Sequence, residues 1–105
     1  MWVLDIRDML DDSLVRPAHR RFSLKVKQLG RIISYATARE AGISVDFHPM
    51  CWRRPNRQAC DGSVEIELRK DHIYWSCPKC DDEGVVTGWR GLIWDLSVFR
   101  SPTTH

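Results

Sequence analysis

The four cysteines limit what this chain can fold into more than any other feature. They are Cys51, Cys60, Cys77 and Cys80 in a chain of 105 residues. Cys77-Pro78-Lys79-Cys80 is a Cys-x-x-Cys turn, which can place two sulfurs on one metal ion. Sixteen residues separate Cys60 from Cys77, a spacing common between the two halves of a four-ligand site. The pattern predicts one structural zinc ion held by four thiolates.

The first pair of cysteines departs from the usual spacing. Eight residues separate Cys51 from Cys60, where a short metal-binding turn has two. We therefore expect a loop whose ends converge, with the basic run 53–57 at its tip. Gly62 follows Cys60 closely and allows the backbone to turn just after the ligand.

Other uses of the cysteines stay open. His48 or His72 could replace Cys51 as a ligand, and the cysteines could instead form two disulfides or stay unligated. An iron site of the rubredoxin type is disfavoured, because such sites normally use two short Cys-x-x-Cys turns. A catalytic zinc is also disfavoured, because four thiolates leave no position for a water molecule.

Composition indicates a globular protein in a reducing compartment. Hydrophobic residues make up 43% of the chain, and no apolar run approaches the roughly 20 residues that span a membrane. The N-terminus reaches a charge at Asp5 and contains no signal-peptide pattern. We therefore expect a cytoplasmic protein, whose thiols stay reduced.

Helical periodicity is found in the first 42 residues. Apolar residues at helical spacing predict a short helix over 3–12, and the Pro17-containing segment 13–24 is expected to be a basic linker. A longer helix is predicted over 25–41, ending before Gly42. Its core-facing residues are Leu29, Ile32, Ile33 and Ala36.

After Gly42 the apolar residues alternate, which indicates strands. We expect strands at 43–48, 64–69, 73–76 and 84–89, with a tight turn at Lys70-Asp71. The predicted fold class is α+β, with an N-terminal helical segment packed on a small antiparallel zinc-ribbon-like sheet. The expected divisions are a helical segment over 1–42, a zinc-ribbon domain over 43–99 and a disordered tail over 100–105. The expected core positions of the second half are Val45, Phe47, Val64, Ile66, Leu68 and Trp75.

The segment from Cys60 to Trp89 resembles a zinc ribbon. The resemblance rests on the CPxC turn and the G-V-V-x-x-W strand that follows it. Asp81 stands where glycine often follows the second cysteine, and Asp tolerates left-handed backbone geometry. The wider cysteine and tryptophan pattern is similar to that of small bacterial proteins with no assigned activity. The resemblance covers about half the chain and implies a fold rather than a role.

Charge is distributed unevenly along the chain. Residues 1–12 carry a net charge of −3, residues 13–60 carry +8, and residues 61–105 carry −3. A basic segment of this kind suits a phosphate-bearing partner, although it can also be a solvated surface. The expected DNA or RNA contacts are Arg53, Arg54 and Arg57 in the loop, with Arg20, Arg21 and Lys25 extending them. Trp52 could stack on an unpaired base.

The sequence favours a non-catalytic zinc-ribbon binding module, nucleic-acid-binding or regulatory. The alternative is a protein–protein interaction module or homodimeric accessory protein, with the acidic ends and the Trp-rich segment 89–99 as its surface. We expect no enzyme and no small-molecule substrate, since the chain has no catalytic His-Cys motif and no phosphate-binding glycine loop.

Overall fold

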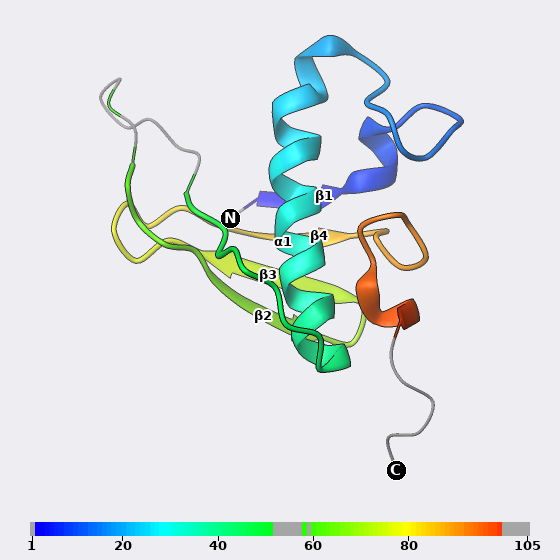
Figure 1. Ribbon diagram of the computed structural model, residues 1–105. Coiled ribbons are helices and arrows are strands. Elements are labelled where there is room, and N and C mark those ends of the chain that lie inside the picture. Colours follow the sequence, from blue (N-terminus) through cyan, green and yellow to red (C-terminus); the bar gives the residue numbers. More distant parts are fainter. Residues whose placement is uncertain (1, 52–57, 59, 100–105) are drawn as a thin grey trace.

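One long helix packs on one face of a four-stranded sheet in the computed structural model (Figure 1). The structure describes residues 2–51, 58 and 60–99. The helix is α1 (Ser23–Ala41) and the strands are β1 (Trp2–Asp5), β2 (Glu65–Arg69), β3 (His72–Ser76) and β4 (Glu83–Thr87). Short 3₁₀ turns are η1 (Ile6–Met9), η2 (Arg20–Phe22) and η4 (Leu96–Phe99). The α+β class is therefore confirmed.

The sheet is mixed rather than purely antiparallel. Its strand order is β1-β4-β3-β2. Strands β2, β3 and β4 pair antiparallel, as the alternating segments predicted. Strand β1 pairs parallel with β4, with Trp2 opposite Gly84 and Asp5 opposite Thr87. Residues on both sides of position 42 thus contribute to one sheet.

The predicted helix over residues 3–12 is wrong, because this segment forms β1 and then η1. A helix of that length gains little stability by itself, and pairing beside β4 gives the same backbone groups partners. Ile6, Met9 and Leu10 are buried, while Val3 is 71% exposed. The Arg7 guanidinium donates to the carbonyls of Gly88 and Arg90 and holds the turn against the end of β4. A strand therefore precedes the main helix, and the helical segment is not N-terminal.

The main helix matches its sequence pattern closely. The predicted core positions Leu29, Ile32, Ile33 and Ala36 are all buried. The helix ends at Ala41, and Gly42 adopts the left-handed conformation (φ 75°) that only glycine adopts without cost. It begins at Ser23, directly after η2, so the expected linker is shorter than 13–24.

The predicted strand over 43–48 is also wrong, because this segment is irregular. It packs beside α1 through rings instead of entering the sheet. The Tyr35 ring lies 6.4 Å from Phe47 and 4.9 Å from His48, and the Arg31 guanidinium lies 4.8 Å from the Phe47 ring. Val45 and Phe47 are half-buried rather than core residues. The alternation of apolar and polar residues over 43–48 therefore reflects partial burial against α1 and not a strand.

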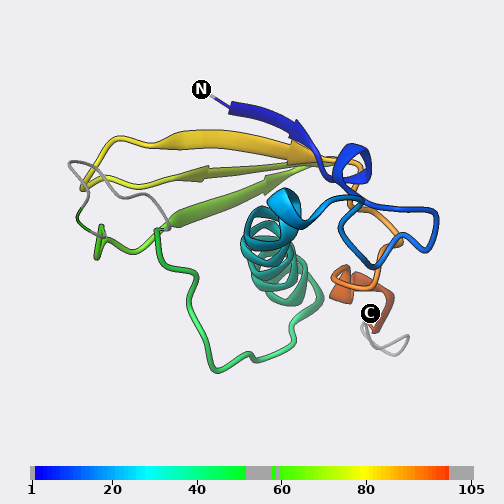
Figure 2. The same ribbon diagram turned by 90° about the horizontal axis from the view of Figure 1, so that it is seen from above.

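The sheet has one covered face and one open face (Figure 2). Ile66, Ile73, Trp75 and Val86 are buried in the cluster that includes the helix residues. The predicted core residue Val64 is also buried, and Leu68 packs against the cluster. The neighbouring positions along each strand alternate onto the face opposite α1. The predicted turn at Lys70-Asp71 is confirmed, with Lys70 at φ 53°.

The segment after β4 returns to the helix. Ser34 Oγ donates to the carbonyl of Trp94, and Thr37 Oγ1 accepts from the Leu96 amide. Gly30 gives Trp94 room against the helix, since a Cβ there would lie 2.5 Å from the indole nitrogen. The expected tail over 100–105 lies outside the described residues. None of the helices in the described part of the chain could cross a membrane.

Candidate metal centre

The fold brings the four cysteine sulfurs into one cluster. The Sγ atoms of Cys51, Cys60, Cys77 and Cys80 all lie within 4.8 Å of one another. Cys51 and Cys80 are 3.5 Å apart, and Cys60 and Cys77 are 3.6 Å apart. These separations far exceed a disulfide bond of about 2.05 Å. Cys77 is buried and the other three cysteines are partly buried.

The cluster has the size of a tetrahedral metal site. With zinc–sulfur bonds of about 2.3 Å, ideal tetrahedral geometry places sulfurs about 3.8 Å apart. The Cys51–Cys80 and Cys60–Cys77 sulfur separations are close to that value. Four thiol donors at this spacing fit zinc, which prefers tetrahedral sulfur ligation in structural sites. The four cysteines could therefore hold one metal ion such as zinc.

Two loops carry the ligands. Cys77 and Cys80 lie in the connection between β3 and β4, where the Cys77 amide donates to the Asp82 carbonyl at 2.7 Å. Cys51 and Cys60 flank the other loop. Its ends converge as expected, because the Cys51 amide donates to the Gly62 carbonyl at 2.9 Å and Met50 bridges Ser63.

Backbone amides point at the sulfurs. Burial raises the pKa of Cys77. Hydrogen bonds from the Cys80 and Lys79 amides and from the Cys60 thiol together lower it by more, so the pKa of Cys77 lies below its ordinary value. The Gly62 amide lowers the pKa of Cys60, while desolvation and the Cys77 and Cys80 thiols raise it above its ordinary value. Amide donors of this kind stabilise thiolates and orient them toward a metal.

Two residues allow the ligand loops to close. A Cβ on Gly62 would lie 2.7 Å from Cys77 Sγ and 3.5 Å from Cys60 Sγ, so only glycine fits beside these sulfurs. Asp81 adopts φ 61°, which confirms that it takes the left-handed position just after the second cysteine of the turn. Its amide donates to the Cys77 carbonyl at 2.8 Å.

Charged and aromatic side chains tie the cluster to the rest of the fold. Lys79 forms an ion pair with Asp61 that joins the two ligand loops, and it lowers the pKa of the Asp61 carboxyl. Trp2 Nε1 donates to Asp82 Oδ1 at 3.1 Å, and the Lys25 ammonium lies 5.2 Å from the Trp2 ring. Nothing in the sequence pattern indicated this link from β1 to the cysteine turn, because strand pairing creates it.

The histidines are placed away from the sulfur cluster. Among the described residues, the close group of ligand atoms contains the four cysteines and no histidine. His48 Nε2 lies 3.0 Å from the Val64 carbonyl, and His72 stacks on Tyr74. The cluster therefore forms without the histidine alternatives.

The expected nucleic-acid contacts are only partly described. Arg53, Arg54 and Arg57 lie outside the described residues, as does Trp52. Arg20 is exposed, and the Arg21 guanidinium lies 5.0 Å from the Phe22 ring. Lys25 is half-buried at the Trp2 ring. Arg20, Arg21 and Lys25 therefore belong to the chain around the start of α1, with Arg21 and Lys25 at different rings.

The chain matches no family model, no curated protein and no solved structure.

Proposed function

We propose that this chain is a non-catalytic zinc-ribbon module that binds nucleic acid. The observation that carries the metal part is the cluster of four cysteine sulfurs, which lie within 4.8 Å of one another. Cys51 and Cys60 flank one loop and Cys77 and Cys80 the other, which is the arrangement of a zinc ribbon. Zinc in this site is structural, and its binding free energy contributes to folding.

The closed ligand set argues against catalysis at the metal. Four thiolates fill the tetrahedral shell, so no position is left for a water molecule or a substrate. Catalytic zinc sites instead keep one open position. The metal of this chain therefore supports the loops around it. Thiolate ligation also agrees with a cytoplasmic protein, where cysteines stay reduced.

The nucleic-acid part rests on the basic middle segment. Residues 13–60 carry +8, and the described members Arg20, Arg21 and Lys25 belong to η2 and the first turns of α1. Arg53, Arg54 and Arg57 lie in the sequence between Cys51 and Cys60, so the metal fixes both ends of the segment that carries them. Basic side chains on a rigid base suit contacts to phosphates.

A binding titration tests this function. Zinc-loaded protein is mixed with fluorescent single-stranded and duplex oligonucleotides over a range of salt concentrations. We expect binding at low salt that weakens as salt increases, because phosphate contacts release counterions. Folded, zinc-loaded protein that binds no nucleic acid at low salt would contradict the proposal and favour the protein-interaction alternative.

A further inference from the structure

The face of α1 that points away from the sheet carries basic side chains. Leu24, Lys27 and Arg31 follow helical spacing and are all exposed, and exposed Arg20 precedes them. No acidic residue occurs between Arg20 and Arg39. Leu24 is 61% exposed, so its apolar side chain is accessible on this face. We name Arg20, Leu24, Lys27 and Arg31 the helix stripe.

Arg31 in the stripe is held in place. Its guanidinium lies 4.8 Å from the Phe47 ring, and Phe47 in turn lies against Tyr35 on the same helix. This contact restricts the side chain before any partner binds, so less conformational entropy is lost on binding. The irregular segment 43–48, which contributes no strand, thus positions one residue of the stripe.

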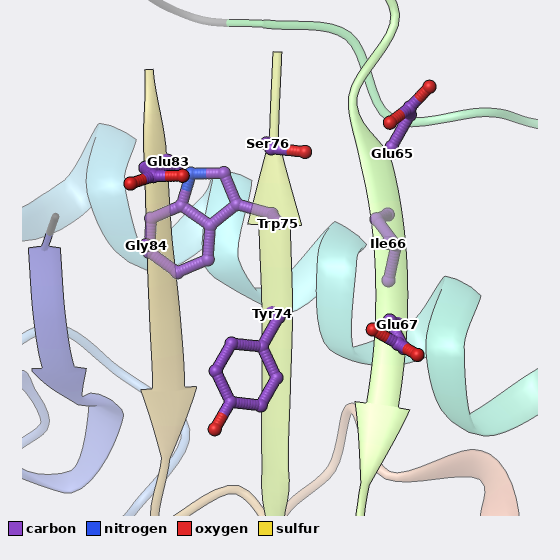
Figure 3. Close-up of a pocket in the computed structure, with 8 residues that line it drawn as sticks. All are labelled: Glu65, Ile66, Glu67, Tyr74, Trp75, Ser76, Glu83 and Gly84. Atoms are coloured by element: carbon purple, nitrogen blue, oxygen red, sulfur yellow. The ribbon is translucent and has the colours of Figure 1, made fainter. Parts of the chain in front are cut away.

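The opposite layer of the molecule has the opposite charge. A pocket of about 240 Å³ on the sheet is lined by Glu65, Glu67 and Glu83, with Tyr74 among them (Figure 3). In that view α1 passes behind the strands. Glu67 is paired with Arg69, while the other two carboxylates add to the negative charge. The exposed face of α1 between Arg20 and Arg39 is therefore basic while this part of the sheet is mainly acidic, a difference that favours approach to a polyanion through the helix.

We infer that the helix stripe docks in the major groove of B-form duplex DNA. This inference rests on the proposed nucleic-acid function and identifies the partner and the contacting face. An α-helix is about 10–12 Å wide with its side chains, and the major groove of B-DNA is about 12 Å wide. The major groove of A-form RNA is too narrow and deep for such a helix. Lys27 and Arg31 contact phosphates, and Leu24 lies where an apolar side chain can meet a thymine methyl group.

The stripe contains no aromatic side chain among its four residues, which further favours a duplex over a single strand. Proteins that bind single strands use aromatic platforms on which bases stack. The Phe47 ring, over which the Arg31 guanidinium lies, is half-buried.

The test compares two double variants that remove equal charge. Lys27→Gln with Arg31→Gln alters the stripe, and Arg69→Gln with Lys70→Gln is the control on the β2–β3 hairpin. Both are checked for zinc content and circular dichroism. Affinities for duplex DNA and duplex RNA of the same sequence are measured at several salt concentrations. We expect the stripe variant alone to weaken DNA binding and lower the salt slope by about two, one for each lost phosphate contact. We also expect the wild type to prefer DNA.

Three results would overturn the inference. If the stripe variant binds like wild type while an Arg53→Gln, Arg54→Gln and Arg57→Gln variant loses binding, the inter-cysteine loop is the contact surface and only the helix inference fails. Equal wild-type affinity for duplex RNA and duplex DNA would contradict groove docking. Wild-type protein that binds no nucleic acid at low salt would remove the proposed function together with the inference.

Discussion

At the scale of single residues, Gly62 controls whether the sulfurs can meet. A methyl group there would overlap Cys77 Sγ at 2.7 Å and crowd Lys79 at 3.0 Å. We expect Gly62→Ala to weaken zinc binding by about 10–100-fold, the usual effect of disturbing groups around metal ligands. Competition with a chromogenic zinc chelator measures this change. Gly91→Ala is the control: its φ of 81° makes alanine costly for stability, but no atom lies within 4 Å of the added Cβ, so zinc affinity should stay unchanged.

Asp81 tests the left-handed position after Cys80. Its φ of 61° costs free energy for any residue with a side chain, and less for Asp than for most. We expect Asp81→Gly to keep the zinc and raise the free energy of unfolding by up to about 1 kcal/mol. Asp81→Val should lower it, because β-branched residues avoid this region. A Gly variant less stable than wild type in thermal melts would show that the Asp side chain contributes more than its backbone costs.

At the scale of elements, the contact between α1 and the segment after β4 depends on Gly30. Glycine inside a helix ordinarily costs about 1 kcal/mol relative to alanine. Here an added Cβ would lie 2.5–2.9 Å from three atoms of the Trp94 indole. We expect Gly30→Ala to destabilise the protein by about 1–3 kcal/mol, because overpacking outweighs the gain in helix propensity.

A double-mutant cycle with Trp94→Ala checks this cause. If the clash is responsible, Gly30→Ala should be stabilising in the Trp94→Ala background, where only helix propensity changes. Denaturant unfolding of the four proteins gives the coupling free energy. A Gly30→Ala change that destabilises both backgrounds equally would mean that Trp94 is not the reason glycine is needed.

The elements differ in how far the sequence predicts them. Helix α1 is predictable because its buried residues follow helical spacing and Gly42 marks its end. Among these buried residues are Leu29, Ile32, Ile33 and Ala36. The β2–β3 hairpin is predictable from local alternation and its turn. Strand β1 is not, because its partner β4 is some 80 residues away and the spacing of Val3 and Ile6 also suits a helix. Pairing across that distance leaves no local pattern.

The candidate site is also predictable only where the sequence pattern is local. The four cysteines and the left-handed Asp81 could be predicted from type and spacing. The hydrogen bond from Trp2 to Asp82 and the position of Lys25 over the Trp2 ring could not, because they depend on β1 joining the sheet.

At the scale of the whole molecule, the cysteine cluster is linked to every strand of the sheet. The ligand loops continue into β2, β3 and β4, and Asp82 reaches β1 through Trp2. We expect a strong chelator to unfold the sheet, since metal-binding free energy becomes folding free energy when the site exists only in the folded chain. Hydrogen exchange of the β1, β3 and β4 amides should increase sharply on chelation. Unchanged protection of those strands would mean that the sheet is stable without the metal.

The most direct test is the metal content of the purified protein. Mass spectra are recorded under native and denaturing conditions for wild type, for Cys77→Ser, and for Ser76→Ala as a neighbouring control. We predict one zinc ion per chain in native wild type and in the Ser76→Ala variant, none under denaturing conditions, and none bound stably by Cys77→Ser. A wild-type protein that is folded and carries no metal, or that carries the four cysteines as two disulfides, would contradict the four-thiolate zinc site.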